Sequence, residues 1–98
     1  MILIIEGKKV LSSKDFHQTI ANCSIVPDFY GKNLDALWDT LTGLIGRPFS
    51  IKWTHSEISK QHMGRDFDKI IKVLEDTKQF DLNLPVIQDA DKFTYKLD

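Results

Sequence analysis

The sequence contains too little of several features that would assign it to a specialised class of protein. One cysteine, Cys23, allows no internal disulfide, so the fold must stand without cross-links and suits a reducing compartment. Three prolines and five glycines in 98 residues argue against a fibrous or disordered chain. A formal net charge of −1 provides no basic surface of the kind that binds nucleic acid. What remains is a globular composition, 42% hydrophobic and 28% charged, in a length that fits one domain.

Long hydrophobic runs are also missing. No stretch approaches the roughly 20 apolar residues that span a bilayer. The first five residues are apolar, but Glu6 and Gly7 follow at once, without the basic lead and long apolar core of a signal peptide. We therefore expect a cytoplasmic protein that neither enters a membrane nor binds nucleic acid directly.

Groups that could carry out catalysis are sparse. His17, His55 and His62 are not paired at helical spacing with a second histidine and a carboxylate, and Cys23 is the only thiol. No nucleophile, base and orienting group come together in the sequence. The sequence thus predicts a protein that is not an enzyme and that has no cofactor and no metal site.

The chain alternates strand-like and helix-like segments. Residues 1–5 form an apolar run typical of a strand buried on both faces. In residues 49–53, Phe49, Ile51 and Trp53 alternate with polar residues, which predicts a strand with these three side chains inward. Apolar residues at helical spacing predict four helices, over residues 13–22, from an Asn33 cap to Gly43, over residues 56–63, and from residue 65 to about 79.

The C-terminal part offers two further strands. Residues 82–87 have the composition of a strand, which Pro85 restricts to a sheet edge because proline cannot donate to the ladder. The alternation in residues 93–97 permits one more short strand. The pattern predicts an α/β domain over residues 1–88, with a three-stranded parallel sheet covered by about four helices. Residues 89–98 are then a C-terminal extension that can add an edge strand.

The second predicted helix carries the unusual feature of the sequence. Opposite its apolar stripe, Asp35 and Asp39 project side by side, one turn apart. Like charges at this spacing cost a few tenths of a kcal/mol, and the helix dipole favours Asp35 in the first turn but helps Asp39 little. The ordinary interpretation is a solvated face. The alternative is a patch for a cationic partner, for which Trp38 supplies the kind of aromatic anchor found at interfaces. Spacing alone leaves both open.

Residues 27–39, which read PDFYGKNLDALWD, closely resemble the signature of the barstar family. The resemblance extends from residue 1 to about residue 88. It implies a small α/β fold and an intracellular inhibitor of a secreted bacterial ribonuclease of the barnase type. Such an inhibitor protects the producing cell's own RNA, and we expect it as a monomer or in a 1:1 complex.

The resemblance also implies which residues contact the nuclease. Asp39 would enter its phosphate site, with Asp35 beside it against basic residues, so that the carboxylates imitate the phosphates of RNA. The implied partner-binding residues are Phe29, Gly31, Asn33, Asp35, Trp38, Asp39, Thr42, Gly43 and Asp76. Phe29 lacks the hydroxyl that family members commonly present, and Asp76 is shorter than the expected glutamate. Together with Lys32 and Leu44, these departures predict a basic bacterial ribonuclease other than barnase.

Two alternatives to ribonuclease inhibition stay open on the sequence. The protein could be an immunity protein against a different class of toxin. It could also be an interaction domain that has kept the fold and changed its partner.

Overall fold

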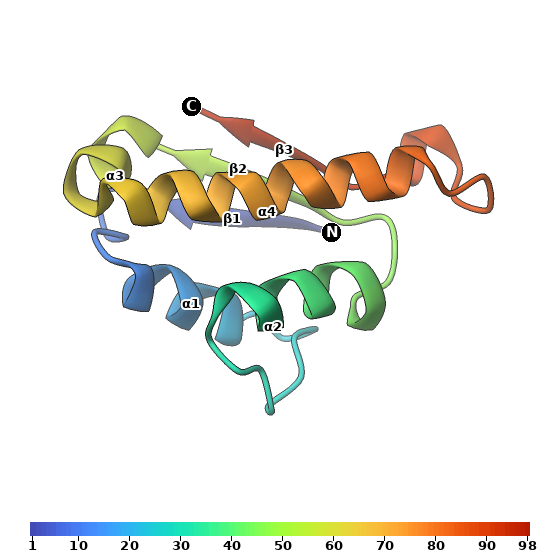
Figure 1. Ribbon diagram of the computed structural model, residues 1–98, viewed down its shortest axis with the longest axis horizontal. Coiled ribbons are helices and arrows are strands. Elements are labelled where there is room, and N and C mark those ends of the chain that lie inside the picture. Colours follow the sequence, from blue (N-terminus) through green and yellow to red (C-terminus); the bar gives the residue numbers. More distant parts are fainter.

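The computed structural model describes all 98 residues and shows a three-stranded sheet with four α-helices (Figure 1). The strands are β1 (Ile2–Glu6), β2 (Ser50–Thr54) and β3 (Thr94–Leu97). The helices are α1 (Ser13–Ala21), α2 (Leu34–Asp39), α3 (Ser56–Met63) and α4 (Arg65–Leu82). A π-helical turn, η1 (Thr40–Leu44), continues α2, and a short 3-10 turn, η2 (Asp89–Asp91), precedes β3. The predicted α/β class is confirmed.

All three strands run parallel, in the order β1-β2-β3. The helices cover one face of this sheet, where Ile51 and Trp53 are buried as predicted. On the other face, Ile2 and Ile4 are 64% and 47% exposed. The prediction of a first strand buried on both faces is therefore wrong. Its continuous apolar run resembles that of a doubly covered strand, but no helix packs on the second face.

The third strand is formed by residues 94–97 and not by the more apolar segment 82–87. A strand over residues 82–87 is not formed, because α4 continues to Leu82 and the following residues make turns. Val86 is 86% exposed, so this segment contributes little to the core. The edge position beside β2 is occupied by β3 instead, directly after the fully buried Phe93. The C-terminal edge strand allowed by the alternation in residues 93–97 is thus present, as the third strand.

The core lies between the sheet and the helices. Phe16 of α1 stacks on Trp53 of β2 with ring centroids 5.2 Å apart, and Phe67 of α4 meets the same indole at 5.0 Å. The Trp53 Nε1 donates to Ser59 Oγ, which donates to the Gly7 carbonyl, both at 3.0 Å. Figure 1 shows α4 running along the sheet, with α1 and α2 beside it. No helix combines the length and the apolar character needed to cross a membrane.

Candidate partner-binding surface

The helix α2 carries two negative charges on its exposed side and packs against the core on the opposite side. Its first turn is capped by Asn33, whose side-chain oxygen accepts from the Ala36 amide at 2.7 Å. Leu37 is fully buried and fixes one side of the helix to the core. On the other side, Asp35 and Asp39 are exposed, and neither forms an ion pair within the protein. These carboxylates are therefore free to meet charges on another molecule.

The loop before α2 holds one aromatic ring inside and one outside. Tyr30 is buried, and its hydroxyl lies 2.6 Å from Nδ1 of His17 in α1. Burial lowers the pKa of His17 and raises the pKa of Tyr30, so both groups are neutral at physiological pH. Phe29 is 75% exposed. Because Tyr30 anchors the loop, Phe29 is presented outward beside the acidic helix.

The helix ends in a widened turn rather than a regular one. The Ile45 amide donates to the Thr40 carbonyl, five residues back, at 3.0 Å. Thr42 turns its hydroxyl inward and donates to the Trp38 carbonyl at 2.7 Å. Gly43 and Leu44 are exposed at the end of the turn. The turn η1 thus extends the outward-facing surface beyond Asp39.

An aromatic contact joins α2 to the last turns of α4. The half-buried ring of Trp38 meets Phe80 edge-on, with centroids 5.5 Å apart and the planes at 80°. Asp76 lies one turn before Phe80 on the same face of α4, so it faces the α2 side. Its carboxylate is paired with Lys72 at 2.9 Å. Phe80 is not among the residues predicted from the sequence to bind a partner. An aromatic residue outside the buried stripe of α4 was the available signal for such a role.

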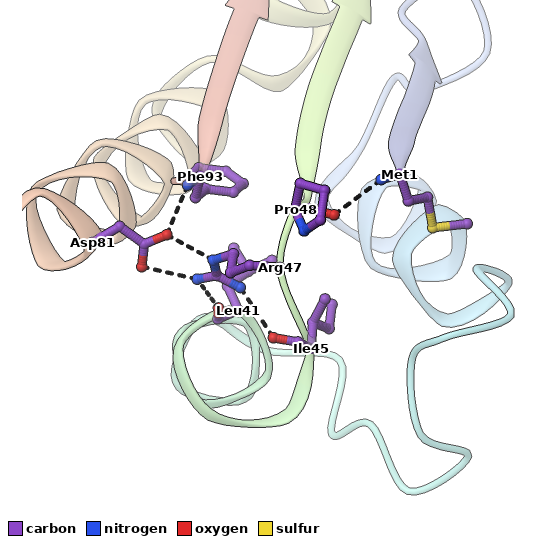
Figure 2. A network of polar contacts seen from close by, with 7 residues as sticks. All are labelled: Met1, Leu41, Ile45, Arg47, Pro48, Asp81 and Phe93. Atoms are coloured by element: carbon purple, nitrogen blue, oxygen red, sulfur yellow. Dashed lines mark hydrogen bonds and ion pairs between the residues drawn. The ribbon is translucent and has the colours of Figure 1, made fainter. Parts of the chain in front are cut away.

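Behind this surface lies an ion pair between Arg47, whose side chain is 12% exposed, and the fully buried Asp81, as drawn in Figure 2. Arg47 donates through Nε and Nη2 to Asp81 at 2.6 and 3.0 Å, and to the carbonyls of Leu41 and Ile45 at 2.7 and 3.0 Å. Asp81 also accepts from the Phe93 amide at 2.7 Å. Burial by itself raises the pKa of Asp81, but the bonds from Arg47 and the Phe93 amide outweigh it and lower this pKa overall. Arg47 and Asp81 are 34 positions apart, and no local pattern in the sequence indicated that they would pair.

No pocket lies on the surface around Asp35 and Asp39. The shallow hollows of the protein are lined by residues of the strands, of the segments next to them and of α1, and none includes a residue of α2 or η1. No group of three His, Cys, Asp or Glu side chains is arranged to hold a metal ion. A projecting pair of carboxylates with aromatic neighbours is suited to enter a cationic cleft on a partner.

The structure brings the predicted site residues onto one side of the molecule. Eight of them lie within residues 29–43, in the loop, α2 and η1, and Asp76 joins them from α4. The exposed members are Phe29, Gly31, Asn33, Asp35, Asp39 and Gly43, while Trp38, Thr42 and Asp76 are half-buried. Their contact with a partner stays a prediction.

The fold and the site together are a small α/β domain with a three-stranded parallel sheet and an acidic helix in the layer that covers it. The family model described as "Barstar (barnase inhibitor)" matches residues 1–97, and the chain belongs to that family. The resemblance read from residues 27–39 is therefore confirmed. A curated relative, "Putative ribonuclease inhibitor YrdF" of Bacillus subtilis (strain 168), is 31% identical over 77 residues. That alignment covers 79% of this chain and 85% of the relative.

Proposed function

We propose that the protein inhibits a basic bacterial ribonuclease by placing Asp35 and Asp39 in its active-site cleft, inside the cell that makes the nuclease. The observation that carries the proposal is the pair of exposed, unpaired carboxylates on α2 in a chain of the barstar family. The curated relative, whose name reads "Putative ribonuclease inhibitor YrdF", supports the same class of activity.

Electrostatics makes a ribonuclease a fitting partner. A nuclease that binds a polyanion must present cationic groups where the phosphates lie, and complementary charge accelerates encounter and fixes register. Asp35 and Asp39 are four residues apart in α2, about 6 Å along the helix axis, so both carboxylates can enter one cleft. Because α2 is capped and packed through Leu37, little ordering of the helix is needed on binding.

The neighbours of the acidic pair define the cleft further. Phe29, Leu44 and Phe80 expose apolar surface around α2, being 75%, 48% and 37% exposed. Lys32 adds a positive charge next to the helix cap, and Lys72 neutralises Asp76. We therefore expect a cognate nuclease with a cationic centre flanked by apolar residues, and not barnase itself.

Titration of a purified basic ribonuclease with the protein tests the proposal. Activity should fall linearly to zero at one equivalent. Asp39→Ala should weaken inhibition by roughly 30-fold or more, the loss expected for an interfacial hot spot of about 2 kcal/mol. The matched control is Asp68→Ala, which removes the same charge from an exposed position in the first turn of α4. This control should inhibit as the wild type does.

Other outcomes would favour the remaining candidates. Equal losses for Asp39→Ala and Asp68→Ala would rule out α2 as the inhibitory surface. Undiminished activity of several basic ribonucleases would favour an immunity protein against another toxin class, or an interaction domain with a different partner. For the proposed complex, the association rate should also fall as ionic strength rises.

A further inference from the structure

We propose that the ion pair between Arg47 and Asp81 is a positioning element for the partner-binding surface. In this role it fixes the turn η1, and with it Thr42, Gly43 and Leu44, against the last turn of α4. The inference rests on the proposed function for its binding consequence. The anchoring of η1 is itself a property of the free protein.

The backbone of η1 explains why a side chain is needed there. In a regular α-helix the Ile45 amide would donate to the Leu41 carbonyl, but in η1 it donates to Thr40 instead. The Leu41 carbonyl therefore needs another donor, and Arg47 Nη2 supplies it at 2.7 Å. The Ile45 carbonyl, just past the turn, accepts from Nη1 at 3.0 Å. The Arg47 guanidinium thus supplies hydrogen-bond donors to two carbonyls at the end of the helical segment.

The other member of the pair, Asp81, is enclosed by the protein. The side chain of Asp81 is fully buried in the last turn of α4, and both its oxygens accept from Arg47. Its Oδ2 also accepts from the Phe93 amide, directly before β3, as Figure 2 shows. Charge-assisted, two-pronged bonds of this kind fix orientation as well as distance. η1 is therefore tied through one residue to both α4 and the sheet.

A second tie lies next to this one. Phe80 directly precedes Asp81 and contacts Trp38, so the last turn of α4 holds α2 through an aromatic pair and η1 through an ion pair. The aromatic contact keeps the helix in place when the ion pair is removed. Loss of the pair should then loosen η1 while Asp35 and Asp39 keep their positions and charges. Steered association depends on those charges, whereas the lifetime of the complex depends on the fit of the whole surface.

The double variant Arg47→Met/Asp81→Asn tests this. It removes one positive and one negative charge together, leaves no buried charge unpaired, and retains an oxygen for the Phe93 amide. In the free protein, hydrogen exchange at the Ile45 amide should become about tenfold faster or more, the mark of local opening. In the complex with the basic ribonuclease, the dissociation rate should rise about tenfold and the association rate should change less than about twofold.

Ser59→Ala is the control for a general loss of stability. It removes the hydrogen bonds of the Ser59 hydroxyl with the buried Trp53 indole and with the Gly7 carbonyl, and it changes no contact of η1 or α2. Its dissociation rate and its Ile45 exchange, measured under native conditions, should stay close to those of the wild type. Equal increases in the dissociation rate for this variant and the double variant would overturn the positioning role.

Two further results would also overturn the inference. One is unchanged Ile45 exchange in the double variant. The other is faster exchange together with a wild-type dissociation rate. If the wild-type protein binds none of the basic ribonucleases, the proposed function fails and the binding consequence falls with it. The exchange measurement then still decides whether the ion pair anchors η1.

Discussion

The aspartates of α2 and the aspartate at the end of α4 use the same carboxylate in opposite ways. Asp35 and Asp39 face solvent and form no ion pair within the chain, whereas the Asp81 side chain is 0% exposed and bonded to Arg47 and to the Phe93 amide. A carboxylate whose partners lie within the chain holds elements together. One without internal partners adds repulsion to the free protein and is available to another molecule. Under the proposed function, stability and binding therefore depend on different aspartates.

The largest effect on stability should come from breaking the buried pair on one side. Arg47→Met leaves the Asp81 charge without its partner, and should lower the free energy of unfolding by about 3 kcal/mol. Urea denaturation measures the change. Arg47→Met/Asp81→Asn should recover part of the loss because no unpaired charge remains. Equal losses in the two variants would show that packing of the Arg47 side chain matters more than its charge.

Acid should act on the same pair. The pKa of Asp81 is lowered in the folded protein, so its contribution to stability is present above the ordinary aspartate pKa of about 3.9 and is lost as pH falls through the folded value. The free energy of unfolding of the wild type should therefore decline below about pH 4. Arg47→Met/Asp81→Asn should decline less over the same interval. Urea denaturation at pH 7 and pH 3 provides the comparison, and parallel declines would remove Asp81 from the explanation.

A smaller effect on affinity should distinguish Phe80, next to the acidic helix, from an apolar surface residue farther along α4. Phe80→Ala removes the ring that meets Trp38 and should weaken the ribonuclease complex by about 1 kcal/mol, or roughly fivefold. Leu82→Ala truncates an apolar side chain that is 51% exposed in the last turn of α4, and should change affinity little. Isothermal titration of both variants tests the distinction. Similar affinities for the two would place Phe80 outside the interface.

The smallest effect should be a gain in stability from a substitution that weakens binding. Asp39→Asn removes repulsion from Asp35 and should raise the free energy of unfolding by about 0.3 kcal/mol while weakening the complex. Asp68→Asn removes a charge that the helix dipole favours, because Asp68 is in the first turn of α4, and should lower stability slightly. Opposite signs in thermal denaturation would support the contrast. A loss of stability in both variants would contradict it.

Much of the fold followed from local patterns. The Asn33 cap, the inward alternation of Phe49, Ile51 and Trp53, and the helix over residues 56–63 all lie where spacing placed them. These features depend on residues within one or two turns of each other, so the sequence carries them directly. The choice of the third strand was different. Residues 82–87 and 93–97 both had strand character, and only the second pairs with β2.

The sequence by itself determined the acidic face of α2, because Asp35, Asp39 and the buried leucines opposite them are set by helical period and composition. Only the tertiary structure decided what stands around that face. It left one side of the sheet open, set Phe80 against Trp38, and joined Arg47 to Asp81 across 34 residues. Such contacts arise from the packing of whole elements, which the local spacing of residues does not encode.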